Sequence, residues 1–189
     1  MQFLQLLFTV IAFASFGSAA LNTTRSFKLV TKVKGAKGHK KFDGLYLSAY
    51  HSGAGLNDAV LLKGKASGIN GFFNTTEYKR PNGKAYHYLE FDLGSEFPYA
   101  AQVSYANYYA QWVPMEIDAG NKQTIGAYFF NKTGLQFTTS PETSNTNGFG
   151  GWLVCNWWRG VPQLFMRQAG YNKTLTSNCA DVHLLPQYL

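Results

Sequence analysis

The sequence predicts an all-β protein, folded as a single compact domain of about 11–12 short strands. Three observations support this prediction. Apolar and polar residues alternate with period two in many short segments, whereas helical periodicity is almost absent beyond residue 20. The chain is 16% aromatic and contains 19 glycines, a composition typical of extended strands joined by tight turns. No segment between the strands has the pattern of a crossover helix.

The alternation is clearest in two segments. The odd-numbered residues from Phe27 to Val33 share one face of a predicted strand, and lysines lie on the other face. The turn Pro81–Lys84, with Asn-Gly at its centre, predicts a hairpin that leads into a strand over Ala85–Leu93. Further strands are predicted over Leu45–Tyr50, Ala59–Leu62, Gly71–Phe73, Gln102–Tyr105, Trp112–Ile117, Ile125–Phe130, Leu135–Thr138, Trp152–Asn156, Leu164–Arg167 and Val182–Leu185.

Two architectures can accommodate this number of strands. A β-trefoil-like closed barrel is favoured, because a dozen short strands suit it and closure removes exposed strand edges. A two-layer β-sandwich is the alternative.

The first twenty residues have the pattern of a secretory signal peptide. The run from Phe3 to Phe13 is apolar, and Ser18-Ala19-Ala20 fits the small-residue rule for cleavage. The run is shorter than the roughly 20 residues that a membrane span needs. We therefore expect a secreted, extracellular protein with no membrane span, whose mature domain covers residues 21–189.

Two features agree with this compartment. Cys155 and Cys179 are the two cysteines of the chain, and a secreted protein usually oxidises such a pair to a disulfide, the alternative being two free buried thiols. Four Asn-x-Thr sequons predict N-glycosylation, at Asn22, Asn74, Asn131 and Asn172.

The net charge of +7 is concentrated near the start of the mature chain. Seven cations occur there with no acidic residue among them: Arg25, Lys28, Lys32, Lys34, Lys37, Lys40 and Lys41. Such a segment is a candidate site for an anionic surface, such as acidic polysaccharide or lipid head groups. The alternative is a solvated strand face that keeps the protein soluble. Nucleic acid is not an expected partner, because the protein is predicted to be secreted and no aromatic residue available for stacking is interleaved with the cations.

Aromatic residues form a second candidate binding feature. Tyr46, Tyr50, Trp157 and Trp158 are candidates for stacking on the sugar rings of a glycan. The alternative is that these rings fill the core and cover the ends of the barrel.

No catalytic residue is predicted. Glu90 and Asp92, like Glu116 and Asp118, lie two residues apart on one strand face, and a carbohydrate-active hydrolase would need two carboxyl groups at a similar separation. Solvated strand faces account for the same spacing. The four histidines form no metal-binding pattern, and no nucleophile elbow, phosphate loop or dinucleotide fingerprint occurs, so neither metal nor cofactor is expected.

Three segments carry a family resemblance: 42–58, 151–165 (GWLVCNWWRGVPQLF) and 177–182. Together they resemble an uncharacterised family of small secreted proteins of filamentous ascomycete fungi. The layout is also loosely similar to that of fungal cell-wall proteins required for phialide formation. The resemblance implies an extracellular, cysteine-paired β-domain and transfers no catalytic residue.

The function expected from these features is that of a secreted, non-catalytic fungal protein. It would act at the cell wall or at a host surface, as an effector-like or glycan-binding factor. One alternative is a carbohydrate-active hydrolase that uses Glu90 or Glu116. Another is a secreted protease inhibitor whose loop, Pro141–Gly151, enters a target protease.

Overall fold

The computed structural model describes residues 25–35, 39–103, 111–120, 126–143, 148–156, 160–170 and 174–189. Within these ranges the chain forms twelve strands and two short 3-10 helices. The all-β fold class predicted from the sequence is confirmed. The elements are β1 (Phe27–Val33), η1 (Lys40–Phe42), β2 (Tyr46–Gly53), β3 (Leu56–Leu62), η2 (Lys65–Ser67), β4 (Asn70–Lys79), β5 (Ala85–Asp92), β6 (Tyr99–Val103), β7 (Trp112–Ala119), β8 (Ala127–Asn131), β9 (Gly134–Thr138), β10 (Phe149–Asn156), β11 (Pro162–Gln168) and β12 (Cys179–Tyr188).

Six of the strands form a ring. Antiparallel pairing joins β12 to β1, β1 to β4, β4 to β5, β5 to β8, and β8 to β9. The last junction is made by packing, since β9 lies against β12 and a side chain at Gly134 would overlap the carbonyl oxygen of Leu184. The ring is therefore irregular, with one junction that has no hydrogen-bonded ladder.

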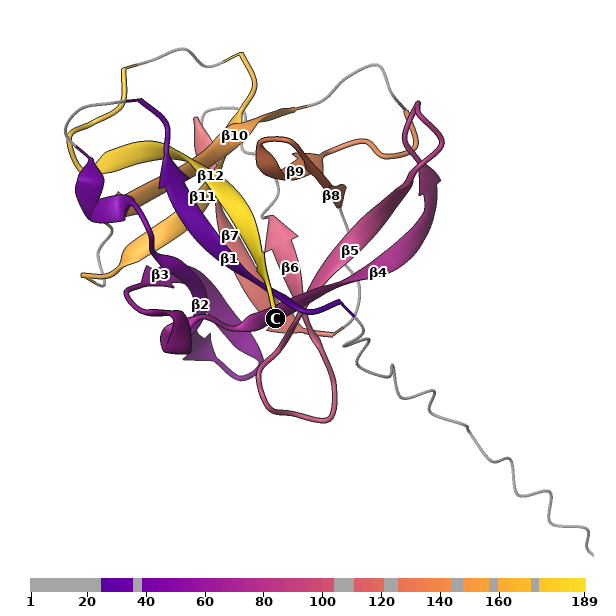
Figure 1. Ribbon diagram of the computed structural model, residues 1–189, viewed down its shortest axis with the longest axis horizontal. Helices are drawn as coiled ribbons and strands as arrows, with labels where there is room; N and C mark the ends of the chain where they lie inside the picture. The colour runs from indigo at the N-terminus through magenta and orange to yellow at the C-terminus, as the bar shows by residue number, and fades with distance from the viewer. Residues whose placement is uncertain are drawn as a thin grey trace, which may run out of the picture.

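The other six strands form three hairpins, β2–β3, β6–β7 and β10–β11. The inner strands of these hairpins pair with one another, β3 with β7, β7 with β11, and β11 with β3. This arrangement resembles the favoured trefoil-like fold, but the ring is not a clean barrel. Figure 1 shows the long β4–β5 hairpin in magenta on the right, with β8 and β9 between it and the strands β10 and β12.

The core consists of apolar side chains from both sets of strands. Leu47, Leu89 and Phe137 are fully buried in it. Trp152 is also buried, and its indole N–H donates a hydrogen bond to the carbonyl of Leu135 at 2.7 Å, so its one polar atom is satisfied.

The predicted disulfide is confirmed. Cys155 on β10 and Cys179 on β12 lie directly opposite each other in the ladder and are bonded. Their side chains are buried together with Leu153 and Phe165, in a small apolar cluster separate from the main core. The bond therefore ties the C-terminal strand to the third hairpin.

One predicted strand is much longer in the structure. The sequence predicted Gly71–Phe73, whereas β4 runs from Asn70 to Lys79 and pairs along most of its length with β5. Residues 74–79 (NTTEYK) are mostly polar and show no apolar alternation in the sequence, so pairing with β5, and not a hydrophobic period, defines the extent of β4. None of the helices in the described part of the chain has the length and hydrophobicity needed to cross a membrane.

Candidate functional site

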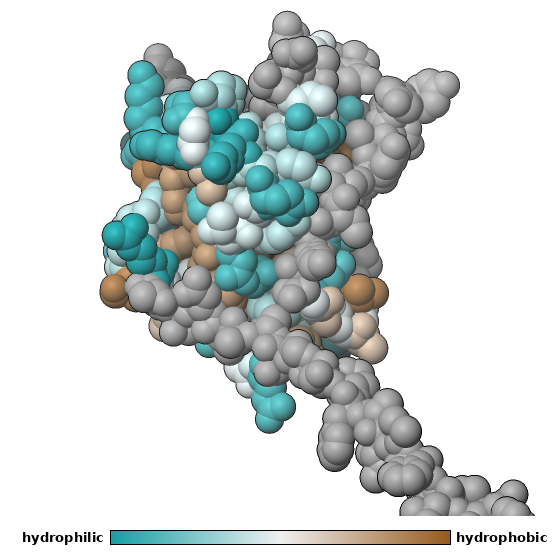
Figure 2. All heavy atoms as spheres, turned by 90° about the vertical axis from the view of Figure 1, so that its right-hand side faces the viewer, coloured by the Kyte–Doolittle hydropathy of each residue, from teal (hydrophilic) through white to brown (hydrophobic). Residues whose placement is uncertain are grey.

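An aromatic cavity lies between the ring strands β1, β4, β5 and β8 and the end of β12. Its volume is about 450 Å³. This falls in the range of natural small-molecule sites. On the face of the molecule that carries the β4–β5 hairpin, Figure 2 shows apolar side chains exposed between hydrophilic ones. The residues that line the cavity are Arg25, Phe27, Phe72, Phe73, Arg80, His87, Phe129, Phe130 and Tyr188.

Three phenylalanine rings from three different strands form its apolar wall. The ring centroids of Phe27 and Phe73 are 5.3 Å apart, those of Phe27 and Phe130 are 5.0 Å apart, and those of Phe73 and Phe130 are 4.9 Å apart. These separations lie in the favourable range for aromatic pairs. Because each ring contacts the other two, the wall is held in place before any ligand arrives.

Two nitrogen-bearing side chains of the β4–β5 hairpin complete the cavity. The Arg80 guanidinium lies 4.8 Å from the centre of the Phe129 ring, and its Nε is buried without a hydrogen-bond partner. The His87 ring stacks on Phe73 with centroids 4.8 Å apart, and its Nδ1 is likewise buried and unpartnered. Burial, and then the positive charge of Arg80, lower the pKa of His87, so its imidazole is neutral at neutral pH.

The turn predicted from Asn82-Gly83 positions Arg80. The Arg80 N–H donates to the carbonyl of Lys84, and the Gly83 N–H donates to the carbonyl of Arg80, both at 2.8 Å. Gly83 has a φ of 78°, a left-handed conformation that glycine adopts without strain. The hairpin turn is therefore confirmed, and its closure places the guanidinium against β8.

Sequence reasoning missed this cavity, although a signal was present. The chain contains Phe-Phe-Asn-x-Thr twice, at 72–76 and at 129–133. In both copies the two phenylalanines line the cavity. The two copies lie on β4 and β8, the two ring strands that flank β5, and His87 of β5 is paired with a residue on each of them. The duplicated motif thus marks both walls beside His87.

Glu90 lies on the same hairpin and is fully buried. The Asn74 amide donates a hydrogen bond to Glu90 Oε2, while Oε1 has no partner. Burial raises the pKa of Glu90 to about 7, and the bond from Asn74 opposes this only in part. A carboxyl group with no exposed surface cannot contact a polymeric substrate, so the geometry gives no support to the hydrolase alternative at Glu90. Glu116 and Asp118, the other predicted pair, are half-buried on β7.

The predicted basic segment is partly used inside the fold. The Lys28 ammonium donates to the carbonyls of Lys65 and Gly68, at 3.0 Å and 2.5 Å, so it holds η2 against β1. Lys32 forms a salt bridge of 3.2 Å with Asp43. Lys34, Lys40 and Lys41 are exposed, Arg25 lines the cavity, and Lys37 lies outside the described residues.

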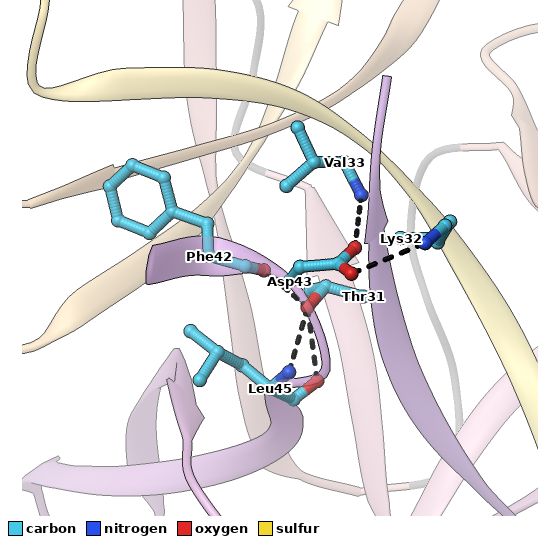
Figure 3. Close-up of polar contacts among 6 residues, drawn as sticks. All are labelled: Thr31, Lys32, Val33, Phe42, Asp43 and Leu45. Carbon is cyan, nitrogen blue, oxygen red and sulfur yellow. Dashed lines mark hydrogen bonds and ion pairs between the residues drawn. The ribbon is translucent and has the colours of Figure 1, made fainter. Parts of the chain in front are cut away.

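Figure 3 shows the contacts that hold the loop before β2 on β1. The Thr31 hydroxyl donates to the Phe42 carbonyl at 2.5 Å and accepts from the Leu45 N–H at 2.9 Å. The Val33 N–H donates to Asp43 at 2.8 Å and, more than the Lys32 ammonium, keeps the pKa of Asp43 below its usual value. Asp43 is the first acidic residue after the seven cations in the sequence, and it pairs with one of them, Lys32.

Of the predicted aromatic residues, the structure describes Tyr46 and Tyr50, which both lie on β2. Tyr50 is 40% exposed, and the Tyr46 hydroxyl donates to Gln187 at 2.9 Å. Trp157 and Trp158 lie outside the described residues. Of the loop Pro141–Gly151, residues 144–147 also lie outside them.

The two described sequons differ in their surroundings. Asn131 is exposed, and its Oδ1 accepts hydrogen bonds from the N–H and the hydroxyl of Thr133, at 2.8 Å and 2.7 Å. Asn74 is half-buried and bonded to Glu90. Asn22 and Asn172 lie outside the described residues.

A second hollow is open and polar. Its volume is about 450 Å³, and its lining includes Lys28, His51, Asn57, Asn70 and Asp92. Asp92 Oδ1 accepts a hydrogen bond from the Gly94 N–H at 2.8 Å. This groove therefore presents both hydrogen-bond donors and acceptors, unlike the aromatic cavity.

Fold and site together define a disulfide-closed, all-β domain with a preformed cavity of small-molecule size. The chain belongs to a family described as "Domain of unknown function (DUF7907)", whose model matches residues 24–188. Comparison with curated proteins found no match, and neither did comparison with solved structures.

Proposed function

We propose that this chain is a secreted, non-catalytic fungal protein that acts at the cell wall or at a host surface, and that the aromatic cavity is its ligand site. One observation carries the assignment of the cavity. Arg80 Nε and His87 Nδ1 are both buried without a partner beside the same aromatic wall. An unsatisfied buried polar group costs about 1–3 kcal/mol, and two such groups beside one preformed aromatic cavity are typical of a functional site rather than of ordinary packing.

Binding to the cavity can be tested with N-phenyl-1-naphthylamine, an uncharged apolar dye whose fluorescence increases in apolar surroundings. The wild-type protein should enhance the fluorescence saturably. Phe129→Ala removes one lining ring that is half-exposed and outside the main core, so it should weaken binding without unfolding the protein. Phe97→Ala is the matched control, because Phe97 is 47% exposed and does not line the cavity. Absence of saturable binding, or an equal loss in both variants, would count against the cavity as a ligand site.

The place of action is supported by the N-terminal segment and the disulfide. Residues 1–20 have the pattern of a secretory leader, and the bond between Cys155 and Cys179 suits an oxidising compartment. Expression with the native leader should deliver the chain to the medium or the wall fraction of a fungal host, with an N-terminus near residue 21. Retention of the full chain inside the cell would contradict this part of the proposal.

Glycan binding is a second candidate, because the open groove offers the mixed donors and acceptors that sugar hydroxyls require. A pulldown on chitin, β-glucan and mannan, comparing the wild type with Asp92→Ala, would test it. Retention that Asp92→Ala abolishes supports the groove, and retention that is unchanged excludes Asp92 from the contact.

A further inference from the structure

The lining of the aromatic cavity is unusual in its hydrogen-bonding capacity. Its polar side chains are Arg25, Arg80, His87 and the hydroxyl of Tyr188, and no carboxylate or amide side chain occurs among the described residues that line it. A guanidinium offers five N–H donors and no acceptor. Hydroxyl groups of a neutral sugar need acceptors as well as donors, whereas the side-chain acceptors of this lining are limited to one imidazole nitrogen and the Tyr188 hydroxyl, so the lining favours a ligand that mainly accepts.

The charge of the cavity is not neutralised by the protein. Within the described part of the chain, neither Arg25 nor Arg80 forms a salt bridge. Arg80 is fixed from two sides, by the backbone hydrogen bonds of its turn and by the Phe129 ring beneath its guanidinium. A fixed guanidinium in half-buried surroundings favours a planar oxyanion, which it can hold through two parallel hydrogen bonds.

The remaining surface defines the body of the ligand. The Phe27, Phe73 and Phe130 rings form a wall with no polar atom, and His87 stacked on Phe73 adds a neutral imidazole whose Nδ1 has no protein partner. Apolar surface and cationic groups therefore meet within one cavity of about 450 Å³. A molecule that fits both is amphipathic, with an oxyanion at one end and an aromatic or aliphatic body at the other.

We infer that the cavity binds a small organic acid of this kind, with its carboxylate or phosphate at Arg80 and its apolar body against the three phenylalanines. This inference rests on the proposed function, since it names the class of ligand for the same site. Arg25, exposed two residues before β1, adds positive charge to the lining of the cavity.

Calorimetric titration of the full mature chain at pH 7 with three matched probes tests the inference. The probes are 4-phenylbutyrate, 4-phenylbutyramide and 4-phenylbutyl phosphate, which share one apolar body and differ in the head group. Charge-assisted hydrogen bonds stabilise by about 1.5–3 kcal/mol, so at least one of the two anions should bind about 10–100-fold more tightly than the amide. The comparison of carboxylate with phosphate then identifies the preferred head group.

Two variants test whether the tighter binding of the anionic probes arises from Arg80 in the cavity. Arg80→Met retains an apolar stem over Phe129 and should bring the ratio of anion affinity to amide affinity to within about 3-fold of one. Lys79→Met removes an exposed cation from the neighbouring position and should change neither value. Thermal unfolding of both variants shows whether they are folded, and Arg25→Met provides a second test if Arg80→Met is not.

Equal affinity for anion and amide, or an anion preference that survives in the folded arginine variant, overturns the inference and leaves the cavity as an uncharged apolar site. Failure of all three probes also overturns it. The uncharged dye then shows separately whether the cavity binds any ligand, so the two proposals fail in distinguishable ways.

Discussion

Replacing the buried Glu90 with glutamine should change how stability depends on pH. The carboxyl has no exposed surface, and its single hydrogen bond comes from Asn74. Burial raises its pKa from the usual 4.5 to about 7. The folded protein therefore binds this proton more tightly than the unfolded chain does, and ionisation opposes folding.

The sign and size of the pH effect on stability follow from the difference between the pKa of Glu90 in the folded protein and in the unfolded chain. Below about pH 4.5 the carboxyl is protonated in both states and costs nothing, and the penalty grows as the pH rises towards about 7, above which it is constant. A difference of this size corresponds to about 3 kcal/mol. Glu90→Gln is neutral throughout, so its free energy of unfolding relative to wild type should rise by about 3 kcal/mol between pH 4 and pH 8. In melting temperature, that is about 6–12 °C.

The assay is urea or thermal unfolding of both proteins at half-unit steps from pH 4 to pH 8. Other titrating groups are shared by the two proteins and cancel in the difference. The new amide leaves a buried N–H without a partner and lowers stability by a similar amount at every pH, so the slope is diagnostic and the offset is not. Glu96→Gln, at an exposed position, should reproduce the wild-type profile. A difference that stays flat within about 0.5 kcal/mol would refute a buried, protonated Glu90.

Four further results are expected. Replacing both Cys155 and Cys179 with alanine should lower the free energy of unfolding, measured in urea, by about 3 kcal/mol. Reductant should have no effect on this variant. An unchanged free energy of unfolding would contradict a stabilising bond. Thr31→Val should cost about 1–3 kcal/mol, because the buried carbonyl and N–H of the following loop lose their partner; a cost under 0.5 kcal/mol would contradict this. Asn131 should carry an N-glycan after expression in a eukaryotic secretory host; peptide mapping checks this, and an unmodified Asn131 would count against it. Asn74→Ala should lower the free energy of unfolding by about 1–3 kcal/mol, because it removes the hydrogen bond to the buried Glu90 carboxyl; an unchanged stability in urea would count against it.

The parts of the fold that the sequence could predict are those that depend on local pattern. Period-two alternation located the first strand, Phe27–Val33, with the same bounds as β1. The Asn-Gly turn located the hairpin between β4 and β5 because few conformations suit that dipeptide. The extent of β4 beyond Phe73 could not be predicted, since residues 74–79 show no apolar alternation and their pairing with β5 is what makes them a strand.

The candidate site likewise contains residues that local sequence could indicate and residues that only the fold brings together. Among the predicted cations, Arg25 lines the cavity, whereas Lys28 and Lys32 are bonded to other parts of the fold. Arg80 and His87 belong to no recognisable motif in the sequence. They become a site because the hairpin turn and the ring place them against phenylalanines from β1 and β8.

The sequence by itself predicted the all-β class and, given an oxidising compartment, the bond between Cys155 and Cys179, because alternation is a local property and two cysteines allow a single bond. Only the tertiary structure decided what surrounds Glu90, Arg80 and His87. Their burial, their missing partners and their shifted pKa values arise from strands that are distant in sequence, and closure of the ring brings those strands together.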